Sequence, residues 1–156
     1  MDHIHATAVS IDGHGVLITG PSGAGKSDLA LRLIDRGAKL VADDRVVTRV
    51  TSGSVSLSAP GNLAGLLEVH GIGIVKLDHQ AWAPLNLVVE LIGRDAVERL
   101  PEDPATEILG HQIPRVRLHA FDAAVAEKVE LAVRIASGAA DRLDERALLA
   151  PLKARP

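Results

Sequence analysis

Apolar residues in this chain fall into short runs that glycine, proline and polar clusters separate, a pattern typical of strands joined by turns. The predicted strands are residues 3–11, 15–19, 38–42, 46–51, 54–59, 85–92 and 112–118. The run at 38–42 is apolar enough for a central strand. The runs at 46–51 and 54–59 predict a hairpin, because Ser52 and Gly53 between them suit a tight turn.

Helical patterns occupy other stretches of the chain. Apolar residues form one helical face over residues 26–36, and Gly37 suits the C-cap of that helix. Asp122 is predicted to cap a helix that ends near residue 136. A last helix, rich in Ala, Arg and Leu, is predicted at about 139–149.

The remaining stretches carry weaker patterns. Residues 63–67 predict a single helical turn, and the two glycines within 68–75 suggest close backbone approach. Residues 93–112 are polar and contain proline, which predicts a loop. Strands and helices together predict a single α/β domain with a mixed sheet over residues 1–137, and residues 138–156 add a C-terminal helix and tail to that domain.

Composition narrows the classes of function. The chain has 156 residues and 47% hydrophobic residues, enough for the core of one domain. One Phe, one Trp and no Tyr disfavour a nucleic-acid-binding protein that stacks bases on aromatic rings, and a net charge of −3 disfavours general polyanion binding. The absence of cysteine excludes disulfides, thiol catalysis and cysteine-ligated zinc. No long apolar run or signal-peptide pattern is present, so we expect a soluble cytoplasmic protein without a membrane partner.

A glycine-rich motif fits the eight-residue P-loop pattern and lies where a P-loop is needed, between a predicted strand and a predicted helix. Its residues are Gly20, Pro21, Ser22, Gly23, Ala24, Gly25, Lys26 and Ser27. The glycines let backbone N–H groups approach an anion, and the helix dipole adds positive potential there. We expect Lys26 to bind the outer phosphates of ATP and the Ser27 hydroxyl to bind Mg²⁺. The alternative is a glycine-rich turn without a ligand.

An acidic pair, Asp43 and Asp44, ends the apolar strand that follows this helix. In a P-loop fold such a strand lies beside the P-loop strand, so its C-terminal end faces the phosphates. One carboxylate can accept a proton from an attacking hydroxyl, and the other can hold Mg²⁺ directly or through water. The alternative is a solvated acidic turn.

Three stretches together resemble the HPr kinase/phosphorylase family: residues 20–27, 40–44 and 68–74, in the same order and at similar spacings. The resemblance extends over about residues 3–135 and is to short forms that consist of the catalytic domain alone. It implies a nucleotide-binding fold similar to that of phosphoenolpyruvate carboxykinases. It also implies phosphorylation of a serine on an HPr-like phosphocarrier protein with ATP and Mg²⁺, and removal of that phosphate by phosphorolysis.

The resemblance also implies roles for individual residues. Asp43 matches the general base of the kinase direction, which is protonated in the reverse direction, and Asp44 matches its acidic neighbour. His5 occupies the position of a histidine close to the catalytic acid. Glu68 and Ser27 match the Mg²⁺ position. For the long forms of the family the resemblance implies a homohexamer, and a short chain is expected to be a homo-oligomer by the same resemblance.

Two stretches depart from the family pattern. His70 stands where the family usually has Arg. The family's basic segment with a catalytic Arg has no clear counterpart after residue 114, and Arg115 and Arg117 are the nearest substitutes. The polar stretch 93–117, which ends in these two Arg, is predicted to contact the protein substrate.

Two other classes of function remain open from the sequence. A small-molecule kinase would use the same phosphate-binding motif with a different acceptor. A nucleotide-sensing regulatory module would keep Lys26 and Ser27 but would not need Asp43. Loss of phosphoryl transfer without loss of nucleotide binding on substitution of Asp43 separates an enzyme from a sensor.

Overall fold

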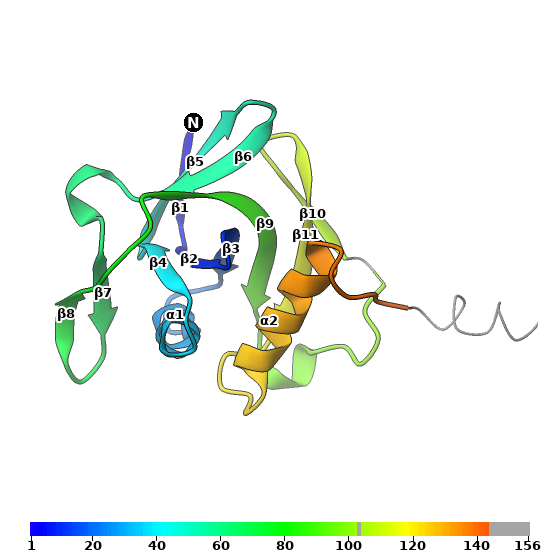
Figure 1. Ribbon diagram of the computed structural model, residues 1–156. Coiled ribbons are helices and arrows are strands. Elements are labelled where there is room, and N and C mark those ends of the chain that lie inside the picture. Colours follow the sequence, from blue (N-terminus) through cyan, green and yellow to red (C-terminus); the bar gives the residue numbers. More distant parts are fainter. Residues whose placement is uncertain (103, 144–156) are drawn as a thin grey trace, which may run out of the picture.

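A curled mixed β-sheet forms the centre of the molecule, and helices α1 (Lys26–Asp35) and α2 (Val125–Ala136) lie side by side along it (Figure 1). The computed structural model describes residues 1–102 and 104–143. The strands are β1 (Asp2–His5), β2 (Thr7–Ile11), β3 (His14–Thr19), β4 (Lys39–Ala42), β5 (Arg45–Thr51), β6 (Ser54–Ser58), β7 (Leu66–Val69), β8 (Gly73–Lys76), β9 (Trp82–Leu91), β10 (Ala105–Ile108) and β11 (His111–Leu118). Two short 3₁₀ turns, η1 (Gly61–Leu63) and η2 (Arg94–Ala96), complete the described elements.

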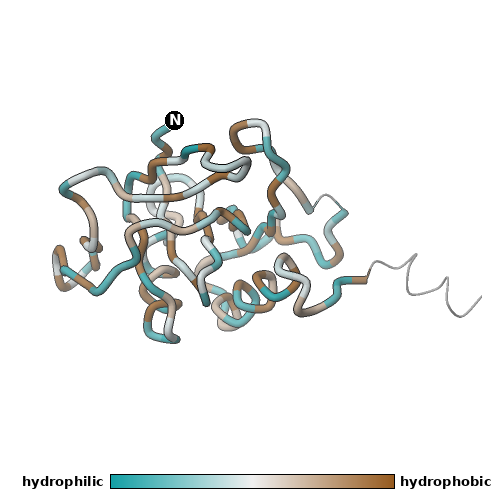
Figure 2. The backbone as a smooth tube through the Cα atoms, turned by 45° about the horizontal axis from the view of Figure 1, so that its top comes forward, coloured by the Kyte–Doolittle hydropathy of each residue, from teal (hydrophilic) through white to brown (hydrophobic). Residues whose placement is uncertain are grey.

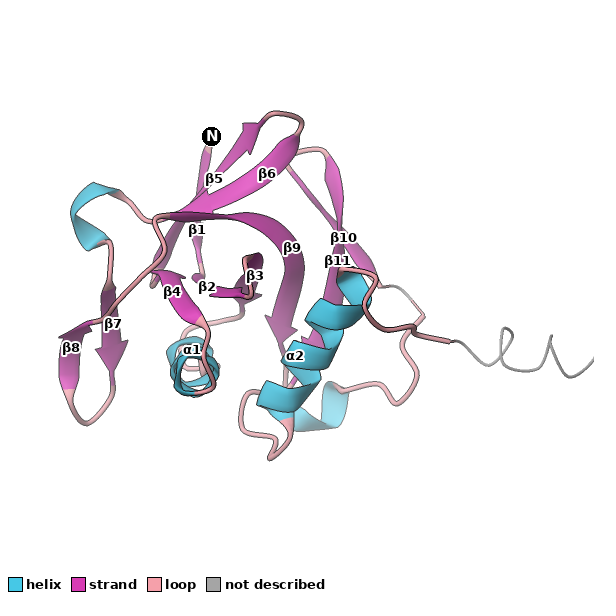
Figure 3. Ribbon diagram, viewed as in Figure 1, coloured by secondary structure: helices cyan, strands magenta, loops and turns pink. Residues whose placement is uncertain are grey.

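The long strand β9 organises the sheet. The strand order is β1-β5-β6-β9-β3-β2-β4, and β11, which also pairs with β10, joins β9. The start of β9 pairs antiparallel with β6, and its remainder pairs in parallel with β3 and β11. Because this one strand of ten residues belongs both to the antiparallel part of the sheet with β6 and to the parallel part with β3 and β11, the sheet bends around it (Figure 3).

Both faces of the central strands are buried, which explains their nearly continuous apolar runs (Figure 2). In β3, Val16 and Ile18 pack with the apolar faces of α1 and α2. Leu17 points to the other face and packs with residues of β5, β6 and β9 on the inner side of the curl. The fold is therefore a mixed α/β domain in which helices cover one face and the sheet itself covers the other.

The predicted strand at 3–11 is two strands that are interrupted at Ala6. β1 pairs with β5, whereas β2 pairs with β3 and β4. The expectation that the strand at 38–42 is central and lies beside β3 is wrong, because β4 is at the sheet edge and β2 lies between them. Its apolar character arises because Leu40 is buried against β7. Since β2 is antiparallel to both neighbours, β4 still runs in the same direction as β3, and its C-terminal end lies at the same side of the sheet.

Several local predictions change as well. The stretch 63–67 is not a helical turn, since η1 ends at Leu63 and β7 starts at Leu66. Gly71 and Gly73 do not allow close backbone approach, because the space where a Cβ would lie is open. Their positive φ values of 90° and 121° instead let the chain turn between β7 and β8.

The predicted loop at 93–112 contains η2, β10 and the start of β11. The strand predicted at 112–118 is β11, which already begins at His111. The hairpin at Ser52 and Gly53 is confirmed. The C-cap of α1 is Arg36, and Gly37 is the next residue, which has a φ of 108° and donates to the carbonyl of Ile34.

Asp122 does not cap α2. The N-cap is Ala124, which makes no side-chain cap hydrogen bond. The Asp122 carboxylate instead accepts a hydrogen bond from Lys128, and this bond lowers the pKa of Asp122 below its ordinary value. The helix predicted at 139–149 is absent over 139–143, and the rest of that stretch lies outside the described residues.

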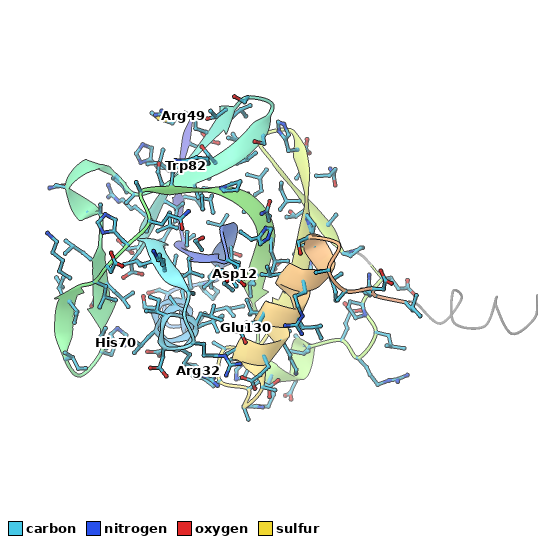
Figure 4. All side chains as sticks on the ribbon, viewed as in Figure 1. Asp12, Arg32, Arg49, His70, Trp82 and Glu130 are labelled. Carbon is cyan, nitrogen blue, oxygen red and sulfur yellow. The ribbon has the colours of Figure 1, made fainter. Side chains whose placement is uncertain are left out.

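Polar contacts connect α1 to α2 and to the turn that precedes α2. The Arg36 guanidinium forms ion pairs with Oε1 of Glu130 at 2.7 Å and with Oε1 of Glu127 at 3.5 Å. The hydrogen bond with Glu130 raises the pKa of Arg36. Arg32 donates to the carbonyls of Asp122 and Ala123 (Figure 4). Neither helix, nor any other helix in the described ranges, is long and apolar enough to span a membrane.

Substitution of Gly15 tests the tight pairing of β3 with β9. An Ala Cβ at this position would lie 2.3 Å from the backbone oxygen of Pro84, so one strand must shift. We expect Gly15→Ala to destabilise the protein by about 2–3 kcal/mol, as overpacking does, and to lower Tm by several degrees in thermal unfolding. The control is Gly93→Ala, where φ is −63° and the space is open. An equal Tm for both variants would contradict the predicted contact.

Candidate functional site

The glycine-rich loop (residues 20–27) joins β3 to α1 at the C-terminal end of β3. Gly23 and Gly25 have positive φ values of 82° and 97°, which glycine adopts at little cost. Gly25 is the N-cap of α1, and no side chain caps this helix end. The first N–H groups of α1 therefore have no side-chain acceptor, and together with the helix dipole they form a site suited to an anion.

Gly25 also meets a neighbouring segment at close range. A Cβ at this position would lie 2.7 Å from the Cβ of Ala120 and 2.9 Å from Cζ of Phe121. The segment after β11 therefore packs directly against the loop, and a larger residue at position 25 would push the two apart.

Lys26 is folded back onto its own loop. Lys26 is only 8% exposed, and its Nζ donates hydrogen bonds to the carbonyl oxygens of Gly20 at 2.8 Å and Pro21 at 3.0 Å. The Lys26 ammonium therefore lies at the N-terminal end of α1 and is hydrogen-bonded there to two neutral acceptors. An anionic oxygen would be a stronger acceptor than either carbonyl.

Asp43 is the most highly connected carboxylate near the loop. Its Oδ1 accepts hydrogen bonds from Thr7 Oγ1 at 2.9 Å and Ser27 Oγ at 2.8 Å. Its Oδ2 accepts from the backbone N–H of Glu68 at 3.0 Å. These donors lie on β2, α1 and β7, so this half-buried carboxylate ties three elements together at one point.

Asp44 lies between β4 and β5 and adopts a left-handed conformation with a φ of 67°. Its Oδ1 lies 3.3 Å from Nε2 of His5. The two side chains are 63% and 69% exposed, so water screens this pair and its contribution to stability is small. His5 thus contacts Asp44, whereas the family resemblance implied a position close to Asp43.

A cavity of about 350 Å³ opens beside the glycine-rich loop. It brings together most of the residues that the sequence predicted for the site: His5, Ser22, Gly23, Gly25, Lys26, Ser27, Asp43, Asp44 and Glu68. Gly20, Pro21 and Ala24 belong to the loop but do not line the cavity. Thr7, Asp28, His70 and Phe121 complete the lining.

The oxygen atoms in this cavity suit a magnesium ion with mixed ligands. Ser27 offers a hydroxyl, and Asp43, Asp44 and Glu68 offer carboxylates. In the part of the chain that the structure describes, no group of three or more His, Cys, Asp or Glu could hold a metal alone. A hydroxyl and one or two carboxylates are oxygen ligands of the kind that Mg²⁺ takes, with water and phosphate oxygens completing its shell.

The family model for the HPr serine kinase C-terminal domain matches residues 1–141. The chain belongs to this family. An HPr kinase/phosphorylase of Bordetella petrii is 39% identical over 144 residues, which are 84% of this chain and 47% of that protein. One of Lactobacillus acidophilus is 35% identical over 146 residues, 86% of this chain and 44% of that protein. The chain thus spans about half the length of the curated relatives it matches.

The family fold is also recognisable in three dimensions. The structure of the HPr(Ser) kinase/phosphatase from Coxiella burnetii superposes with a TM-score of 0.76 at 28% sequence identity. The match covers 86% of this chain and 89% of that one. The curled mixed sheet with its two helices is therefore the arrangement found in a solved member of the HPr kinase family.

The two Arg considered as substitutes for the family's catalytic Arg lie elsewhere. Arg115 and Arg117 line a second cavity of about 370 Å³, which shares no lining residue with the first. Their guanidinium groups lie 3.8 Å and 3.3 Å from Oε2 of Glu90, the residue opposite Arg117 in the parallel β9–β11 pair. The smaller cavity is the better candidate site, since it holds the anion-binding helix end and the buried lysine.

Four lining residues, Thr7, Asp28, His70 and Phe121, were not among the site residues predicted from the sequence. Thr7 is fully buried in an apolar stretch of β2. In the sequence, only its position as a single polar residue between Ala6 and Ala8 could have indicated a role in the site. Phe121 lines the cavity although it lies far along the chain from the glycine-rich loop, and only its status as the single Phe marks it in the sequence.

A double-mutant cycle tests the Thr7–Asp43 hydrogen bond. We expect Thr7→Val and Asp43→Ala to be coupled by about 1 kcal/mol in free energies of unfolding from urea denaturation. The matched cycle pairs Thr7→Val with Asp44→Ala, and these effects should add to within about 0.5 kcal/mol because the Thr7 hydroxyl bonds Asp43. Equal coupling in both cycles would show that the hydroxyl does not act through Asp43.

Proposed function

We propose that this chain transfers the γ-phosphoryl group of ATP, with Mg²⁺, to a serine of an HPr-like phosphocarrier protein. The observation that carries the proposal is the position of Asp43, held by three donors in the same cavity as Lys26 and Ser27 of the glycine-rich loop. The class of acceptor is proposed from the relatives, which are HPr kinase/phosphorylases.

In this proposal, residues 20–27 act as a P-loop within a nucleotide-binding fold similar to that of phosphoenolpyruvate carboxykinases. The free N–H groups at the start of α1 bind phosphate oxygens, and Lys26 exchanges the carbonyls of Gly20 and Pro21 for anionic acceptors. This exchange favours ATP because charge-assisted hydrogen bonds are stronger than neutral ones.

Ser27 and Glu68 are the proposed protein ligands of Mg²⁺, which neutralises negative charge on the β- and γ-phosphates when it is bound. The Ser27 hydroxyl could bind the metal through an oxygen lone pair and still donate its hydrogen to Asp43. Thr7 and the Glu68 N–H also keep their hydrogen bonds to the carboxylate. Asp43 therefore keeps its orientation, and because a carboxylate has about four acceptor sites, one lone pair is left for the acceptor.

Asp43 is the proposed general base. Its carboxylate takes the proton of the serine hydroxyl while the serine oxygen forms a bond to the γ-phosphorus. The bond from that phosphorus to the bridging oxygen breaks, and ADP leaves with the bonding electrons. Asp44, next along the chain and paired with His5, acts on positioning or on the metal rather than on this proton.

The reverse reaction is part of the proposal, because the relatives' names couple a kinase with a phosphorylase. Inorganic phosphate attacks the phosphorus of phosphoserine, pyrophosphate forms, and the departing serine oxygen takes the proton from protonated Asp43. Addition of phosphate to the serine-phosphorylated carrier protein should therefore release pyrophosphate in an amount equal to the dephosphorylated serine.

Lys26→Ala is expected to weaken Mg-ATP binding by about 10-fold or more, because it removes one charge-assisted contact to the phosphates. Turnover should fall as well, while thermal unfolding stays cooperative. Lys39→Ala is the control, since Lys39 is exposed at the start of β4 and does not line the cavity. Isothermal titration with Mg-ATP measures the effect, and an unchanged affinity for Lys26→Ala would refute phosphate binding at the loop.

Asp43→Asn is expected to lower serine phosphorylation by about 10²–10⁴-fold while Mg-ATP binding changes little. The amide can keep all the contacts, because the hydroxyls of Thr7 and Ser27 accept hydrogen bonds as well as donate them. Labelled ATP, Mg²⁺ and an HPr-like protein provide the assay, with a binding titration on the same sample.

The control for this experiment is Asp44→Asn, whose defect should be partly rescued by raised Mg²⁺. Parallel loss of binding and transfer in Asp43→Asn would make Asp43 a metal ligand or a structural residue. A nucleotide sensor would bind Mg-ATP and label no serine in the unsubstituted protein, and a small-molecule kinase would consume ATP only with a small acceptor.

A further inference from the structure

The only Phe of the chain is held in the wall of the cavity beside the glycine-rich loop. Phe121 is 55% exposed, in a protein that also has one Trp and no Tyr. The Trp, Trp82, lies at the start of β9 and does not line this cavity (Figure 4). The cavity thus combines a helix end suited to an anion with a Phe ring, the only Phe, Trp or Tyr ring among the described residues that line it.

Several contacts fix this ring in place. His119 packs edge-on against it, with ring centroids 5.8 Å apart and an interplanar angle of 72°. Nδ1 of His119 lies 3.0 Å from the carbonyl oxygen of Ile92, which anchors the imidazole to the end of β9. Arg94 donates to the carbonyl oxygen of Phe121 at 3.4 Å. The backbone and one edge of the ring therefore have contacts without a ligand, which reduces the side-chain entropy that Phe121 would lose on contact with a ligand.

The ring also borders the phosphate-binding backbone. Cζ of Phe121 would lie 2.9 Å from a Cβ at Gly25, the N-cap of α1. A ligand with phosphates at this helix end and a planar apolar group beyond them would cover both surfaces. Nucleotides have this combination, whereas inorganic phosphates and polyphosphates lack the planar group.

We propose that Phe121 contacts the nucleobase of the phosphoryl donor and so favours a nucleoside triphosphate over an inorganic polyphosphate. The inference rests on the proposed function, since it assigns a further contact to the same donor. Stacking on an aromatic ring accepts any base, because every base has a π-face. Affinity for the donor should therefore depend on the ring, while ATP and GTP bind with similar affinity.

The test compares two donors that share the phosphates and differ in the base. Mg-ATP and Mg-tripolyphosphate are titrated by calorimetry into the unsubstituted protein, Phe121→Ala, Phe121→Leu and Phe121→Trp. Phe121→Ala and Phe121→Leu should weaken Mg-ATP by about 5- to 100-fold and leave tripolyphosphate within about 2-fold. Phe121→Trp should retain the affinity for Mg-ATP, and so should the control Trp82→Ala.

Three outcomes would overturn the inference. Equal losses for both ligands would mean that the ring shapes the loop through its contact with Gly25. Unchanged affinity for both ligands would mean that the base lies elsewhere. A raised KM for the protein acceptor with unchanged Mg-ATP affinity would assign the ring to the acceptor instead.

The same titrations separate this inference from the proposed function. If the unsubstituted protein binds both ligands with the expected dependence on Phe121 but phosphorylates no serine, the base contact stands and the proposed function fails. If it binds neither ligand, both fail together.

Discussion

The hydrogen bonds to the Asp43 carboxylate are the interaction on which the arrangement of the site depends. Thr7, Ser27 and the N–H of Glu68 reach this group from β2, α1 and β7. A half-buried carboxylate needs such donors, because its charge is costly to remove from water without them. The bond from Ser27 also sets the distance between the start of α1 and the end of β4.

The curled sheet makes this convergence possible. β3 and β4 run in the same direction although β2 separates them, so the loop after β3 and the acid after β4 emerge on one side of the sheet. β9 and β11 run parallel to β3, and Phe121 follows β11 toward the same side. The apolar core on both faces of β3 holds these strand ends in register.

The two cavities differ in what their basic side chains are bonded to. Lys26, buried at the helix end, is held by neutral carbonyls that an anion can replace. Arg117 is already paired with Glu90 in the second cavity, so an anion there would have to compete with a carboxylate. An anion could therefore bind Lys26 without displacing a carboxylate, whereas at Arg117 it could not.

The sequence by itself determined the local features: the glycine-rich loop between strand and helix, the hairpin at Ser52 and Gly53, and the acidic pair after the strand at 38–42. These depend on backbone conformation and short-range patterns that neighbouring residues set. It placed the strand at 38–42 wrongly beside β3, because an apolar edge strand covered by β7 has the same composition as a central one. Only the tertiary structure brought Thr7 and Phe121 to the cavity, since both arrive through contacts between distant segments that no local pattern encodes.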